Sequence, residues 1–274
     1  SPVAVGVHPN SIATGFMNDD PHLDLAVASG GGNRDVKLLL GDGSGGFSSV
    51  LPIDVTNNAS YPNGDADINY LISGDFDGDG ETDLALTKES GYPEIDDHIK
   101  IMKGDGLGGF VPLATTSLGK SVYGPYGLAA GNFNGDGHVD LAVTMYDSNA
   151  VRIFLNSGAG TFTEAAGSPV TVGATPLRVA AADLDRDGAD DLAVTNYGGN
   201  TMSVLLGNGD GTFSAAPGSP LATGAGPVGL IAGDMDQDGK PDIVVANGGA
   251  STFSLFAGNG DGTFQPRQDF NTGA

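Results

Sequence analysis

The stretch DMDQDGKPD at residues 234–242 places carboxylates at alternate positions and again at the ninth position, around one glycine. Alternate residues of a tight loop point inward, so positions 1, 3, 5 and 9 can surround one cation. The carbonyl of position 7 is a further ligand, and the glycine at position 6 permits the sharp turn. These oxygen ligands favour calcium, because zinc prefers histidine or cysteine and magnesium keeps several waters in a small shell.

Three further loops repeat this pattern at the same place in a longer repeat. The predicted calcium ligands, in chain order and with the residue that contributes a carbonyl given last for each loop, are Asp75, Asp77, Asp79, Asp83 and Glu81; Asn132, Asn134, Asp136, Asp140 and His138; Asp183, Asp185, Asp187, Asp191 and Ala189; and Asp234, Asp236, Asp238, Asp242 and Lys240. The two asparagines of the second set lower its charge, which predicts weaker affinity. Any one loop alone could be a solvated turn without metal, but four copies favour about four calcium ions.

A fifth loop, FMNDDPHLD at residues 16–24, is degenerate. Phenylalanine replaces the first ligand and proline replaces the glycine, which leaves Asn18, Asp20 and Asp24 as a weaker fifth site. The final aspartates of the five loops, Asp24, Asp83, Asp140, Asp191 and Asp242, are 59, 57, 51 and 51 residues apart. The chain is therefore built from five copies of one unit.

Each unit contains four short β-rich runs and no helical periodicity. Two apolar runs follow each acidic loop, and a glycine-rich turn then ends at Phe47, Phe110, Phe162, Phe213 or Phe264. Four strands in about 50 residues are typical of a β-propeller blade. We predict an all-β fold, a single β-propeller domain over residues 1–274 with five four-stranded blades; the alternative is part of a larger seven-bladed ring.

The predicted repeats cover residues 7–55, 68–118, 124–172, 175–223 and 226–274, with the polar runs 168–173 and 219–224 as fourth strands. Residues 1–6 resemble such a fourth strand and are predicted to form an extra outer strand.

The motif DxDxDGxxD before a strand, together with the glycine-rich turn into phenylalanine, resembles the FG-GAP/VCBS repeat. That repeat builds integrin-α-type propellers and many secreted bacterial proteins. The resemblance implies calcium loops between strands one and two of each blade, on one face, with ligands usually bound on the opposite face. Two features depart from the family: five units are seen where seven blades are common, and the first loop lacks its first acid.

Composition limits the partners. The chain has 34 acidic and 11 basic residues, a net charge of −23, and no cysteine for disulfides or thiolate chemistry. So little positive charge disfavours nucleic acid and anionic membranes, and no apolar run is long enough to span a bilayer. The absence of a signal segment before Ser1 indicates a processed chain. We expect a secreted or cell-surface protein, either a monomer or one part of a larger multidomain chain.

The face opposite the acidic loops collects aromatic and polar residues. Two insertions in the repeat, 56–67 and 88–98, fall there, and loop insertions on a rigid scaffold often carry function. Tyrosine rings stack on sugars and carboxamides bind hydroxyls, so a glycan or a protein surface is the expected ligand. The predicted ligand-binding residues are Tyr61, Tyr92, Asp96, His98, Tyr123, Tyr126, Tyr146, Asn149 and Tyr197. The alternative is that these residues only form and pack the turns.

Catalytic groups are sparse. His98 beside Asp96 and Asp97, with Tyr92 and Arg34 nearby in the repeat, could perform acid–base chemistry. No nucleophile or oxyanion site accompanies them, so a role without catalysis is favoured. Three hypotheses remain: a calcium-stabilised extracellular binding module, a polysaccharide lyase or hydrolase on a propeller scaffold that needs His98 or Arg34, and a structural spacer of a surface protein.

Overall fold

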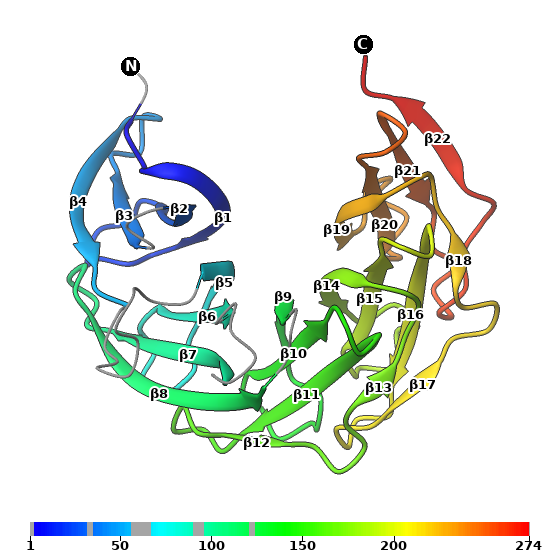
Figure 1. The fold of residues 1–274 in the computed structure, drawn as a ribbon, viewed down its shortest axis with the longest axis horizontal. Helices are drawn as coiled ribbons and strands as arrows, with labels where there is room; N and C mark the ends of the chain where they lie inside the picture. The colour runs from blue at the N-terminus through cyan, green and yellow to red at the C-terminus, as the bar shows by residue number, and fades with distance from the viewer. Residues whose placement is uncertain (1–2, 32–34, 56–66, 90–95, 121–123, 274) are drawn as a thin grey trace. The chain divides into compact units, whose positions relative to one another are not determined.

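The computed structural model describes residues 3–31, 35–55, 67–89, 96–120 and 124–273. The secondary structure in these ranges consists of β-strands (Figure 1). No helix in the described part of the chain is long and apolar enough to cross a membrane.

Five antiparallel sheets follow one another along the chain, and the first four strands of each sheet pair in sequence order. The first two sheets contain β1 (Val7–Gly15), β2 (Asp24–Gly31), β3 (Val36–Gly41) and β4 (Phe47–Ile53), then β5 (Asp67–Gly74), β6 (Asp83–Glu89), β7 (Asp97–Gly104) and β8 (Phe110–Gly119). The third contains β9 (Pro125–Gly131), β10 (Asp140–Met145), β11 (Ala150–Asn156), β12 (Phe162–Glu164) and β13 (Val170–Thr171). The fourth contains β14 (Pro176–Ala182), β15 (Asp191–Asn196), β16 (Thr201–Gly207), β17 (Phe213–Ala215) and β18 (Leu221–Ala222). The fifth contains β19 (Pro227–Gly233), β20 (Asp242–Asn247), β21 (Thr252–Phe256) and β22 (Gln268–Asn271).

These sheets confirm the predicted fold class, an all-β propeller with five four-stranded blades. The outer strand differs from the prediction in the third and fourth blades, where it consists of two pieces. Both β12 and β13 pair with β11, and both β17 and β18 pair with β16. A serine hydroxyl replaces the missing strand partner in each gap, because Ser168 Oγ accepts from Ile153 N at 3.1 Å and Ser219 Oγ accepts from Val204 N at 2.9 Å. The fourth strand therefore begins at the phenylalanine and resumes near residues 170 and 221.

The expected extra outer strand at residues 1–6 is not formed over its described part. Val3 to Gly6 have no strand pairing, and residues 1–2 lie outside the described ranges. The Val5 carbonyl instead accepts a hydrogen bond from Ser29 Oγ of β2 at 2.8 Å. At the other end of the chain, β22 pairs with β21 as the outer strand of the fifth blade.

The chain divides into two compact units, residues 1–125 with 156–162, and residues 126–155 with 163–274. The core of the first unit contains residues from strands of the first two blades, with Leu38, Leu71 and Leu84 among its fully buried side chains. The second unit has two such cores, one between the third and fourth blades and one between the fourth and fifth. Every residue of β10 and β15 is buried, which explains why the predicted apolar runs are continuous rather than alternating.

In the third and fourth blades, the phenylalanine that closes the glycine-rich turn packs against the acidic loop of the preceding blade. In the first unit the rings of Phe76 and Phe162 meet edge to face with centroids 6.3 Å apart, and in the second unit Phe133 and Phe213 do so at 5.5 Å. Phe76 and Phe133 occupy the second position of their loops. The phenylalanine of the repeat thus belongs to the interface between consecutive blades.

Candidate metal centre

The acidic loop of each blade connects its first and second strands, and the final aspartate is the first residue of the second strand. This buried aspartate binds two other parts of the blade, and we name the arrangement the aspartate latch. One carboxylate oxygen accepts from the backbone N–H of the second loop residue at 2.7–2.9 Å in all five blades. In four blades the other oxygen accepts from a glycine N–H at or just past the end of the third strand, at 2.8–2.9 Å. The latch residues are Asp24, Asp83, Asp140, Asp191 and Asp242.

The glycine that completes the latch has no room for a side chain. A Cβ added at Gly258 would lie 2.0 Å from the Pro241 carbonyl oxygen, and one added at Gly104 would lie 2.2 Å from the Thr82 carbonyl oxygen. In these four blades the close approach of the two strands requires glycine at this position, whereas the third blade has Asn156 there.

Burial of the latch carboxylate makes its negative charge costly. Desolvation raises the pKa of Asp83 and raises that of Asp191 to about 6, although the backbone donors oppose this shift. Nearby loop aspartates raise both pKa values further. A cation beside these carboxylates would relieve the cost.

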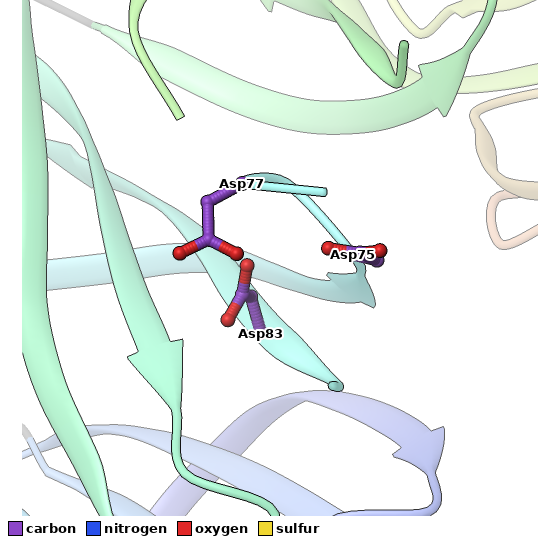
Figure 2. A group of neighbouring side chains, drawn as sticks. All are labelled: Asp75, Asp77 and Asp83. Atoms are coloured by element: carbon purple, nitrogen blue, oxygen red, sulfur yellow. The ribbon is translucent and has the colours of Figure 1, made fainter. Parts of the chain in front are cut away.

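Three loops bring carboxylates of positions 1, 3 and 9 together. The groups are Asp75, Asp77 and Asp83; Asp183, Asp185 and Asp191; and Asp234, Asp236 and Asp242, with ligand oxygens within 4.8 Å of one another in each group. In Figure 2 the carboxylates of Asp77 and Asp83 face each other, and Asp75 lies on the other arm of the loop. An all-oxygen set with three negative charges can hold a metal ion.

The acid of position 5 is arranged differently from those of positions 1, 3 and 9. Asp79, Asp187 and Asp238 lie outside the three-carboxylate groups, and one oxygen of each accepts from the N–H of position 7 at 2.8–2.9 Å. This contact closes an Asx-type turn that shapes the loop. The second carboxylate oxygen of position 5 is the one that could reach an ion.

The asparagine-containing loops are arranged in their own way. In the third blade, Asn132 Oδ1 is buried without a hydrogen-bond partner, as expected for an oxygen placed to bind a cation. Asn134 Nδ2 donates to Asp136 Oδ2 at 2.8 Å, and Asn18 Nδ2 donates to Asp20 Oδ2 in the first blade at the same distance. An amide thus lies against the carboxylate of position 5 in both loops.

The residue at position 4 of the loop adopts the left-handed backbone conformation in four blades, a feature that the sequence analysis missed. Gly78 and Gly135 have φ of 79° and 72°, and Arg186 and Gln237 adopt φ of 65° at the equivalent place. The signal was present in the two loops with glycine there. The first aspartate holds this conformation, as Asp183 does by accepting from the N–H groups of Asp187 and Gly188 at 3.1 Å.

The next blade supports the loops of the second, third and fourth blades through the carbonyl of position 2. In the first unit Asn156 Nδ2 donates to the Phe76 carbonyl at 2.8 Å. In the second unit Gly211 N donates to the Phe133 carbonyl at 2.8 Å. The loop geometry therefore depends on the packing between consecutive blades as well as on the loop's own residues.

The structure describes only some of the residues predicted for the ligand face and the catalytic alternative. Tyr61, Tyr92, Tyr123 and Arg34 lie outside the described residues. The rings of Tyr126 and Tyr146 lie together in the second unit, with centroids 5.1 Å apart, at the strand ends farthest from the acidic loop. Tyr197 is 44% exposed after β15. Asn149 has φ of 52° and accepts from Thr175 N at 2.8 Å, so its side-chain oxygen supports a turn.

His98 is not a surface group. Its exposure is only 8%, and burial and the nearby Lys88 lower its pKa. Lys88 and Lys100 are also buried, and both donate to the Val55 carbonyl, at 3.2 and 2.7 Å. The neighbouring Asp96 accepts from Ser117 Oγ at 2.8 Å. His98 therefore lies within the second blade beside two lysines, a poor position for acid–base work on a polysaccharide.

Fold and site together define a repeat-built β-propeller whose blades carry acidic, cation-suited loops. The chain belongs to the FG-GAP-like repeat family, whose model matches residues 75–143, 132–194, 183–245 and 234–274. A comparison with curated protein sequences gives no match.

Solved structures share the fold at low sequence identity. A protein from Lactobacillus plantarum is 19% identical with a TM-score of 0.68, over 96% of this chain and 71% of that one. A protein from Desulfotomaculum acetoxidans, described as functionally unknown, is 16% identical with a TM-score of 0.67, over 98% and 72%. The periplasmic gluconolactonase of Pseudomonas aeruginosa is 17% identical with a TM-score of 0.64, over 97% and 71%. At these identities the likeness shows the fold alone.

We expect Asp24→Ala to lower the free energy of unfolding by about 3 kcal/mol, because two backbone N–H groups lose a buried charged acceptor. Chemical denaturation in metal-free buffer measures this effect, and Asp20→Ala in the same loop is the control with little effect. Equal stabilities of the two variants would contradict the aspartate latch.

We expect the Asp191 carboxyl to titrate near pH 6 in metal-free protein, as resolved by carbon NMR. Because its pKa is raised from 3.8, this group contributes stability that is full below pH 3.8 and lost as the pH rises through about 6. Asp210 of the same blade is the control, since hydrogen bonds from Thr212 lower its pKa. A midpoint for Asp191 at or below that of Asp210 would contradict the effect of burial.

Proposed function

We propose that this protein is a calcium-stabilised extracellular recognition module. The observation that carries the proposal is the recurrence of one three-carboxylate group at the same place in three blades. Calcium would lie in the loops of the second, fourth and fifth blades, with a weaker site at Asn132 and Asp140 in the third. When bound, the ion supplies the positive charge that the buried carboxylates lack.

The donor chemistry supports calcium over other metals. Two oxygens that share one calcium ion at about 2.3–2.6 Å lie at most about 5 Å apart, and the ligand oxygens of each group lie within 4.8 Å. Each latch carboxylate keeps lone pairs for an ion, since a carboxylate has about four acceptor sites and Asp191 uses three of them on Leu184, Asp185 and Gly207. Loops of this type also suit the higher calcium concentrations outside cells.

The ligand face would be the one opposite the loops. Tyr126 and Tyr146 form a tilted aromatic pair there, and Tyr197 adds a partly exposed ring. Such rings stack on sugars or anchor a protein partner. A glycan is the preferred ligand, and a protein surface is the alternative. The burial of His98 argues against the catalytic hypothesis.

Adding calcium to metal-free protein is expected to raise the free energy of unfolding by about 2.7 kcal/mol for each site filled at 100 times its Kd. Differential scanning calorimetry across a calcium titration measures the gain. Asp185→Asn should remove the contribution of the fourth blade, whereas Asp210→Asn, an acid of the same blade outside the group, should not. A melting temperature that does not respond to calcium would contradict the proposal.

A panel of glycans and polysaccharides, screened with calcium and with chelator, tests the recognition role. We expect binding without product release, and a loss of about tenfold or more in affinity for Tyr197→Ala, because an exposed stacking ring is removed. Phe16→Ala is the matched control, since Phe16 is 54% exposed at the loop end of the first blade. Turnover would support an enzyme, and an absence of binding would favour a protein partner.

A further inference from the structure

One lysine reaches into the acidic loop of the second blade. Lys103 lies near the end of β7, and its ammonium pairs with both Asp77 Oδ2 and Asp79 Oδ2, the latter at 2.5 Å. Asp77 belongs to the three-carboxylate group of this blade, and Asp79 is its position-5 acid. The side chains of Lys103 and Asp77 are 33% and 10% exposed, so the ion pair is partly shielded from water.

No other repeat has a cation at this position. Lys103 directly precedes Gly104, the glycine of the aspartate latch. The residues at the equivalent position of the other blades are Leu40, Leu155, Leu206 and Ala257. Lys240 also pairs with a loop acid, Asp238, at 2.7 Å. However, Lys240 is the position-7 residue of its own loop, and Asp238 lies outside the three-carboxylate group. Lys103 is therefore a specific feature of the second blade.

An ammonium and a divalent cation cannot share the same carboxylate oxygens, because like charges about 4 Å apart repel strongly in a partly desolvated site. We propose that Lys103 is a built-in counter-cation of the second blade, which competes with calcium for Asp77 and Asp79. This inference rests on the proposed calcium function. Without metal, Lys103 offsets one of the negative charges of the second loop. The loop fills with calcium only at higher concentrations than the loops of the fourth and fifth blades, when Lys103 is displaced.

The test is a calcium-binding isotherm on the full metal-free chain, recorded by isothermal titration calorimetry. Lys103→Met is expected to tighten one site by about tenfold, because it removes the competing charge and the charge count of a loop tunes its calcium affinity. Lys103→Arg keeps the charge and is expected to bind as the unaltered chain does. Lys240→Met removes the same charge beside another loop and is the matched control, with a smaller change.

A second pair of variants assigns the tightened site. In a chain that carries Asp75→Ala, adding Lys103→Met should produce no gain, because the competing site is already lost. A gain that persists there, or an equal gain from Lys240→Met, would overturn the inference in favour of a general charge effect. Calcium binding that is unchanged by Lys103→Met overturns the inference alone, whereas no calcium binding by any chain overturns the proposed function as well.

Discussion

A fully buried aspartate ties the acidic loop to the third strand in this propeller, and the architecture of the blade depends on it. Asp191 illustrates the arrangement, since its two oxygens accept from Leu184 N at 2.7 Å and Gly207 N at 2.8 Å. These contacts satisfy backbone donors at a point where two strands come too close for any side chain but hydrogen. The cost is a charge removed from water, which the raised pKa of Asp191 reflects. The aspartate that closes the blade is thus also the residue whose buried charge a bound cation would stabilise.

The side chains around the latch aspartate differ among the five blades. The fourth and fifth gather three carboxylates each, and the second gathers three but also presents Lys103. The third and first substitute carboxamides at position 3, and Asn134 and Asn18 donate to the position-5 acid. Asp24 keeps its latch contacts in the first blade, where the other ligands are degenerate. Within its described residues, the first blade therefore has the latch contacts without the three-carboxylate group, so the two features do not depend on each other.

The sequence predicted the blades and the loops well because both depend on local spacing. The alternation of acids around glycine and the repeated phenylalanine are visible without coordinates, and the structure brings the acids of positions 1, 3 and 9 together in the second, fourth and fifth blades. Non-local contacts could not be predicted. Lys103 lies 26 residues from Asp77 in sequence, and the burial of His98 depends on neighbouring strands. The division of the outer strand into two pieces depends on a serine hydroxyl that replaces a backbone partner, which strand propensity does not register.

The most direct test of the account is a crystal structure grown in millimolar calcium, with anomalous scattering used to locate the ions. The account predicts an ion about 2.3–2.6 Å from carboxylate oxygens of Asp183, Asp185 and Asp191, and another in the equivalent group of the fifth blade. The latch hydrogen bonds to Leu184 and Gly207 should remain in place beside the ion. Acidic loops without ions in such crystals would contradict the account, and would leave the buried aspartates with a structural role only.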